Sequence, residues 1–105
     1  MFVYAHWLRD GYQQIHAFNK PDRAAQFAYE QIMQYAANEE RQLKRGPEPK
    51  EFPAELKVLR DKLDTTPNPT LKEALALIEL YEDYCRYVVG QESPLHTITD
   101  ISVVE

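Results

Sequence analysis

The three histidines are the residues of this chain best suited to acid–base or metal chemistry. His6 and His16 lie in apolar-aromatic stretches on either side of Asp10-Gly11, and His96 lies near the C-terminal end. Imidazoles from adjacent strands bind a metal such as zinc when further ligands complete the site. No carboxylate stands at ligand spacing from the first two histidines, and metal-bound imidazoles normally have such partners. We therefore expect no metal site and interpret the histidines as side chains of half-exposed strands.

Nucleophilic and phosphate chemistry have weaker candidates. The single cysteine, Cys85, falls on the apolar stripe of an expected helix, where a thiol is usually buried and inert. The chain has no G-x-S-x-G turn, phosphate loop or dinucleotide fingerprint. The carboxylate pairs Glu39-Glu40 and Glu82-Asp83 belong to solvated helix faces. We expect no catalytic residue, no cofactor and no enzymatic activity. A small enzyme, or a ligand- or metal-binding domain, that uses the hairpin histidines is the alternative.

Charge is distributed unevenly along the chain. The net charge is −5, and Lys, Arg, Asp and Glu leave residues 1–62 at +1 and residues 63–105 at −6. An acidic half repels phosphate backbones, so we expect no direct nucleic-acid binding. Acidic surfaces favour solubility or docking to a basic protein surface.

Cysteine content and hydropathy indicate the compartment. One cysteine permits no intrachain disulfide, which is typical of a reducing compartment. No stretch of about 18 apolar residues could span a membrane, and the N-terminal aromatic run lacks the basic leader and long apolar core of a signal peptide. We therefore expect a cytoplasmic protein with no membrane contact.

The segment 2–18 predicts a β-hairpin, and its register decides which residues share a face. A two-residue Asp10-Gly11 turn would mix apolar and polar residues on both faces, whereas a three-residue loop that begins at Arg9 sorts them better. We favour the three-residue loop. One face then carries Val3, Ala5, Trp7, Ile15 and Ala17, with Gln13 near the turn, and we expect it in the core. The other carries Phe2, Tyr4, His6, Leu8, Tyr12, Gln14, His16 and Phe18.

Helical periodicity and capping residues predict the first long helix over 20–45. Asn19 is the expected N-cap, Pro21 suits the first turn, and Gly46 suits the C-terminal end. Phe27 and Met33 fall outside its apolar stripe and are available to a second layer or a partner.

The second half of the chain alternates proline-rich and apolar segments. Residues 46–53 form a proline-rich linker, and a short helix is expected over 54–63. A capping box of Thr70 and Glu73 opens a core helix over 71–89, and Gly90 ends it.

The β-branched tail predicts a third strand over 95–104. The expected fold is α+β, with the order ββαααβ in a single domain, 1–105. The hairpin and the C-terminal strand form a small three-stranded antiparallel or mixed sheet, packed on two long helices and one short helix.

Uncovered sheet residues would form an interaction surface. If helices cover one side of the sheet only, the aromatic face of the hairpin remains exposed, and patches of this kind mark interfaces. A second copy of the chain and a different protein are equally suitable occupants of that face. The expected partner-binding residues are Phe2, Tyr4, His6, Tyr12, His16 and Phe18 on the hairpin, and Glu79, Glu82 and Asp83 on the acidic helix.

In size, acidity and lack of catalytic motifs, the chain resembles small inhibitors encoded by phages or mobile elements, such as anti-CRISPR and other anti-defence proteins. The resemblance is one of type and implies an accessory protein that occludes a partner's surface. We therefore expect a non-catalytic protein-binding module, an inhibitor or adaptor, that docks on a basic surface. Where that surface binds nucleic acid, the protein would compete for it.

Overall fold

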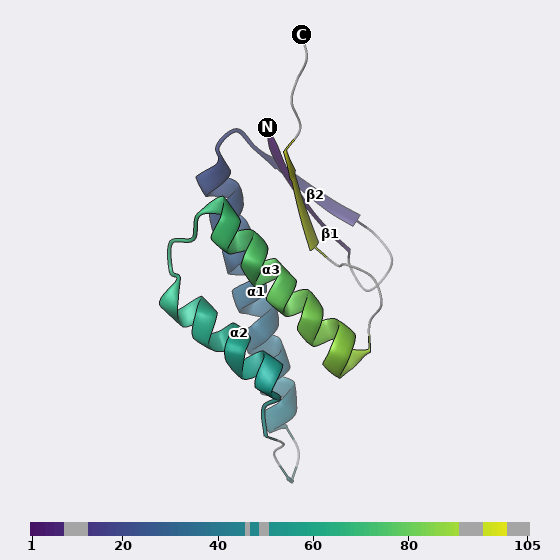
Figure 1. Cartoon of the computed structure of the whole chain (residues 1–105). Coiled ribbons are helices and arrows are strands. Elements are labelled where there is room, and N and C mark those ends of the chain that lie inside the picture. Colours follow the sequence, from purple (N-terminus) through teal and green to yellow (C-terminus); the bar gives the residue numbers. More distant parts are fainter. Residues whose placement is uncertain (8–12, 46, 49–50, 91–95, 101–105) are drawn as a thin grey trace.

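The computed structural model describes residues 1–7, 13–45, 47–48, 51–90 and 96–100. Figure 1 shows the predicted α+β order, ββαααβ. The elements are β1 (Phe2–Trp7), β2 (Gln13–Phe18), α1 (Pro21–Lys44), α2 (Ala54–Thr65), α3 (Leu71–Tyr84), which continues as a π-helical turn (Cys85–Val89), and β3 (His96–Asp100).

The three strands form one antiparallel sheet in the order β2-β1-β3. In the hairpin, Tyr4 pairs with His16 and Ala5 with Ile15. This register is the one that a three-residue loop requires, so the predicted register is confirmed, although the loop itself lies outside the described residues. The C-terminal strand pairs with β1, which is therefore the central strand.

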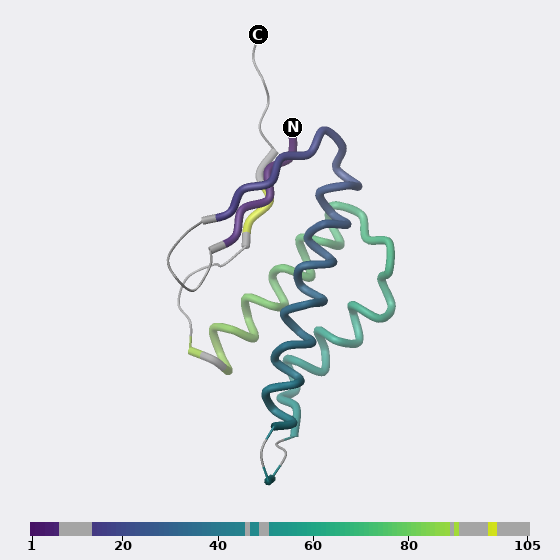
Figure 2. The backbone as a smooth tube through the Cα atoms, turned by 180° about the vertical axis from the view of Figure 1, so that it is seen from behind, coloured from purple at the N-terminus to yellow at the C-terminus, as the bar shows by residue number. Residues whose placement is uncertain are grey.

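The sheet covers one side of the helices. Figures 1 and 2 show α1 and α3 beneath the sheet, and α2 on the side of these two helices that faces away from it. Three leucines of α2 and the alanine-rich stripe of α1 are buried with α3 in one core. The buried Tyr29 hydroxyl donates to the carbonyl oxygen of Leu63 at 2.8 Å, which ties α1 to the C-terminal turn of α2.

The ends of α1 differ in detail from the sequence prediction. Its N-cap is Lys20, without a side-chain capping bond, so the expectation for Asn19 is wrong by one position. Pro21 occupies the first turn, where its fixed φ suits the helix and its missing N–H is not needed. The C-cap is Arg45 in an extended conformation, and the expected terminator, Gly46, lies outside the described residues.

The ends of the α3 segment follow the local sequence signals. The Thr70 hydroxyl oxygen accepts from the backbone N–H of Glu73 at 3.2 Å, and the Glu73 carboxylate accepts from the Thr70 N–H at 3.0 Å. The predicted capping box is therefore confirmed. The π-helical turn ends at Gly90, whose φ of 86° lies in the left-handed region that glycine adopts without a steric penalty.

The hairpin face expected to be exposed is the face packed on the helices. Tyr4 is 0% exposed and His6 3%, while Ile15, expected in the core, is 62% exposed. Ala17 is exposed as well. The prediction of which face is buried is therefore wrong, and the side chain of Trp7 lies outside the described part of the chain.

Size and hydrogen bonding explain the reversal. The inward face carries large rings, whose burial contributes more than that of the small side chains on the outward face. Its polar atoms would be costly to bury without partners. Among the described residues, no buried side-chain nitrogen or oxygen lacks a hydrogen-bond partner. The aromatic-histidine face is therefore the better core.

The capping box can be tested by mutation. Thr70→Ala removes the acceptor of the Glu73 N–H and should lower the free energy of unfolding by about 1 kcal/mol in urea titrations. Because the two side chains act reciprocally, the losses from Thr70→Ala and Glu73→Ala should sum to more than the loss in the double variant. Strictly additive losses would contradict a reciprocal box.

The orientation of the sheet gives a second test. Tyr4→Ala should lower the free energy of unfolding by about 3 kcal/mol or more, because it empties a buried aromatic site. Ile15→Ala should change it by less than about 0.5 kcal/mol, as expected for a largely exposed side chain. Urea titration of both variants measures the difference, and the reverse order of losses would show that the opposite face is buried.

Candidate functional site

His6 is the centre of a hydrogen-bonded group between the sheet and α1. Its Nε2 lies 2.9 Å from the side-chain oxygen of Gln14, and its Nδ1 lies 3.1 Å from the hydroxyl of Tyr35. An amide oxygen only accepts, so Nε2 carries the proton and donates. In the neutral ring, Nδ1 then accepts from Tyr35. Both ring nitrogens are engaged within the chain.

The second histidine packs into an aromatic cluster centred on Phe27 of α1. The His16 ring lies 4.4 Å from the Phe27 ring and 5.7 Å from that of His6, measured between centroids. Tyr4 meets Phe27 edge-on at 5.3 Å, and Phe18 lies at the same distance. Phe27, outside the main stripe of its helix, is therefore the residue on which the sheet packs.

This aromatic cluster is an internal interface between sheet and helices. Of the six hairpin residues expected to bind a partner, Tyr4 and His6 are buried, Phe2, His16 and Phe18 are half-buried, and Tyr12 lies outside the described residues. The expectation of an exposed aromatic surface is wrong, because α1 covers it. Within the described part of the chain, no group of three His, Cys, Asp or Glu side chains could hold a metal ion.

Tyrosines link α1 to the C-terminal half of α3. The rings of Tyr35 and Tyr81 stack at 5.6 Å, and the Tyr84 hydroxyl donates to the Glu39 carboxylate at 3.1 Å. Burial raises the pKa of Tyr84 above its ordinary 10.0, and the charge of Glu39 raises it further. The Tyr84 hydroxyl therefore stays protonated and acts as a fixed donor from α3 to α1.

Cys85 is buried, as expected from its position on the apolar stripe. Burial raises the pKa of its thiol above the ordinary 9.0; a hydrogen bond with Tyr81 acts in the opposite direction. The thiolate is the nucleophilic form, so a raised pKa makes this cysteine a poor nucleophile.

The acidic residues expected to bind a partner come together on the outside. Glu79, Glu82 and Asp83 line a groove of about 470 Å³ between α3 and β3. We call it the α3–β3 groove, and its other described lining residues are Leu75, Ile78 and Arg86 of α3 and Thr97 and Ile98 of β3.

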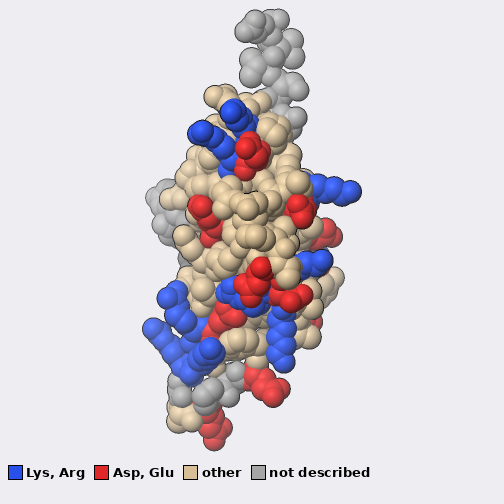
Figure 3. Space-filling model, turned by 90° about the vertical axis from the view of Figure 1, so that its left-hand side faces the viewer, with Lys and Arg blue, Asp and Glu red and all other residues tan. Residues whose placement is uncertain are grey.

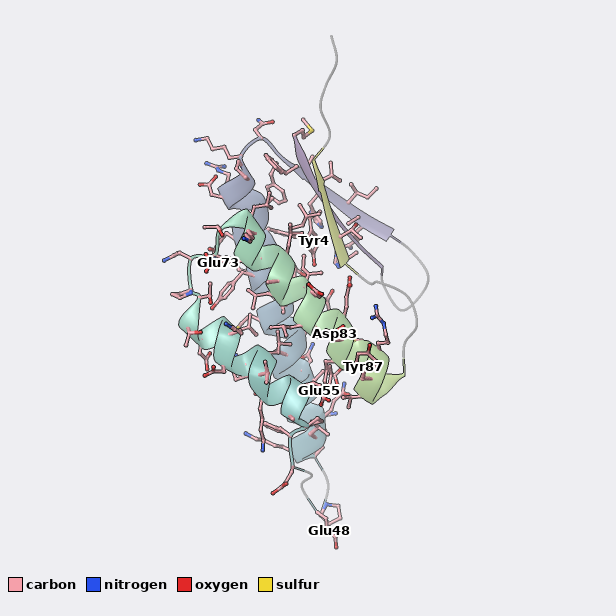
Figure 4. The ribbon with its side chains drawn as sticks, viewed as in Figure 1. Tyr4, Glu48, Glu55, Glu73, Asp83 and Tyr87 are labelled. Carbon is pink, nitrogen blue, oxygen red and sulfur yellow. The ribbon has the colours of Figure 1, made fainter. Side chains whose placement is uncertain are left out.

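Charge and exposed apolar surface occur together in this groove. The Arg86 guanidinium lies 3.7 Å from the Asp83 carboxylate, so the described lining carries three carboxylates and one cation. Leu75 is 42% exposed. Figure 4 shows Asp83 on the C-terminal half of α3. Figure 3 shows another face of the molecule, on which acidic and basic side chains are interspersed.

Sequence reasoning identified the three carboxylates of the groove and missed its apolar residues. Leu75 lies off the buried stripe of α3, and an apolar side chain in that position is a signal of partial exposure. Thr97 and Ile98 gave no such signal, because their place beside α3 follows from the pairing of β3 with β1.

Comparison of the chain with protein-family models, with curated proteins and with solved structures found no match. Nor does any helix in the described ranges have the length and apolar character needed to cross a membrane.

The raised pKa of Cys85 predicts a pH dependence of stability. The unfolded chain releases the thiol proton at a lower pH than the folded chain. The stabilisation that comes from keeping the Cys85 thiol protonated is therefore complete below pH 9.0 and is lost as the pH rises above that value. Cys85→Ser removes the titrating group. The difference in free energy of unfolding between wild type and Cys85→Ser should therefore shrink as the pH rises through 9.0 in urea titrations. A difference that stays constant or widens would contradict a buried, protonated thiol.

Proposed function

We propose that this chain is a non-catalytic protein-binding module that acts as an inhibitor or adaptor by covering a basic surface of a partner protein. The observation that carries the proposal is the α3–β3 groove, in which three carboxylates lie beside the exposed side chain of Leu75 and the half-buried side chain of Ile98. We further propose that it acts in the cytoplasm, as one lone, buried thiol suits a reducing compartment.

Each kind of residue in the groove has a distinct part in this proposal. Leu75 and the exposed part of Ile98 offer apolar area, which supplies affinity when it is removed from water. The carboxylates accelerate encounter with a basic partner and disfavour acidic ones. The net charge of −5 gives the whole molecule the same preference. A groove of about 470 Å³ has room for several partner side chains.

Occlusion is the mechanism we propose. A partner whose basic surface binds nucleic acid would lose that ligand when the acidic groove covers it, because both compete for the same cations. This is the mode of action implied by the likeness in size and acidity to phage-encoded and mobile-element inhibitors. The binding role assigned to the hairpin face is withdrawn, since that face packs on α1.

Histidine chemistry has less support as an alternative. His6 is 3% exposed, and both of its ring nitrogens have partners within the chain. An acid–base or ligand-binding role would require substrate to reach this ring, which the packing of Tyr4 and Phe27 opposes.

The binding proposal predicts that the carboxylates of the groove determine the affinity for the partner protein. Glu79→Gln/Asp83→Asn keeps the size of both side chains and removes two charges. It should weaken binding of a protein purified from the source cell by about tenfold, equivalent to about 1.4 kcal/mol. Titration calorimetry measures the affinity, and a thermal melt establishes that the variant is folded.

A matched control uses exposed acidic residues of other helices. Glu30→Gln/Glu55→Gln removes the same charge from α1 and α2 and should leave the affinity unchanged. Equal affinities of wild type, groove variant and control variant would place the binding surface elsewhere. Equal losses in both variants would show that net charge alone, rather than the groove, attracts the partner.

A further inference from the structure

The β3 strand forms one edge of the described sheet. The order β2-β1-β3 gives it β1 on one side, and no strand in the described ranges pairs with its other side. An edge strand presents backbone N–H and C=O groups at alternate residues, which another chain can use for pairing.

This edge borders the α3–β3 groove. Thr97 and Ile98 line the groove from the strand side, and α3 lines it from below the sheet. Ile98 pairs with the inward-facing Tyr4 and packs against the core, so it marks the face of the sheet that looks toward α3. A strand added beside β3 would lie about 4.8 Å further out and would extend that face over α3.

From these features we infer that the groove binds an extended basic segment of the partner, which pairs with β3 as a fourth strand. The inference rests on the function proposed above and specifies its ligand. Alternate side chains of the segment would turn toward α3 and meet its carboxylates, and the backbone would pair with β3. A helical segment has no free backbone groups to offer this edge, so an extended segment fits better.

Spacing and charge agree with an alternating sequence. Side chains on one face of a strand repeat at about 6.7 Å. Residues three or four apart on a helix, such as Glu79 with Glu82 or Asp83, rise by about 4.5–6 Å along its axis. Lys and Arg on alternate positions can span this difference, because their side chains are long and flexible. Leu75, which is exposed, leaves apolar area for a further inward-facing residue.

Synthetic peptides test the inference on the full chain labelled with ¹⁵N. The probe is an acetylated peptide of repeated Lys-Val-Arg-Val units, and its control has the same composition with all cationic residues first. The alternating peptide should bind about tenfold more tightly, shift the amide resonances of Thr97 and Ile98, and lose about tenfold in affinity with Glu79→Gln/Asp83→Asn. Its affinity should not change with Glu30→Gln/Glu55→Gln.

N-methylation tests the backbone pairing itself. One peptide carries N-methyl groups on every cationic residue and another on every valine, so that each blocks the donors of one edge of the strand. Pairing with β3 predicts that only one of the two loses binding, by tenfold or more. Equal affinities, equal losses or no binding of the alternating peptide would overturn the inference.

Failure here is distinguishable from failure of the proposed function. If the peptide with its cations first binds as tightly and loses affinity with the groove variant, the groove takes basic segments, but not as a fourth strand. If the partner protein also binds Glu79→Gln/Asp83→Asn as tightly as wild type, both proposals fail. The remaining candidate for this edge is a second copy of the chain, and sedimentation of the free chain measures its oligomeric state. A concentration-dependent dimer that the alternating peptide cannot dissociate would assign this edge to the second copy and overturn the inference.

Discussion

The packing of the inner face of β1 on α1 is the constraint on which the rest of the structure depends. Tyr4 lies edge-on against Phe27, and His6 is hydrogen-bonded to Tyr35. Side chains alternate along a strand, so these two contacts also decide which residues of the sheet face outward. They bring β1 onto the helices, and β3, paired to β1, is placed along α3. The α3–β3 groove is a consequence of that placement.

The same packing divides the polar residues of the chain between two tasks. Between sheet and helices, His6 is hydrogen-bonded to Tyr35 and Gln14, and between α1 and α3 the Tyr84 hydroxyl donates to Glu39. Carboxylates of α3 lie outside, in a groove that also exposes the side chain of Leu75. Residue types that are often catalytic therefore stabilise the fold, and the acidic helix face carries the binding surface that we propose.

Local signals in the sequence predicted local structure correctly. Thr70 and Glu73 are three residues apart, and their capping box depends on nothing further away. The hairpin register followed from sorting apolar and polar side chains. The choice of buried face did not follow, because it depends on Phe27 and Tyr35, whose place beneath the sheet is decided by tertiary packing. The same reason explains why only part of the groove was predicted. Its carboxylates are neighbours in sequence, whereas Ile98 lies beside them only because β3 pairs with β1.

The measurement that tests this account most directly is a nuclear Overhauser spectrum of the aromatic and methyl protons. With the inner face packed as described, the Tyr4 ring protons show cross-peaks to the Phe27 ring, whose centroid lies 5.3 Å away, and the methyl protons of Ile15 show none to any residue of α1 or α3. Cross-peaks from the Ile15 methyl groups to these helices, without a contact between Tyr4 and Phe27, would contradict the orientation of the sheet and the position of the groove that follows from it.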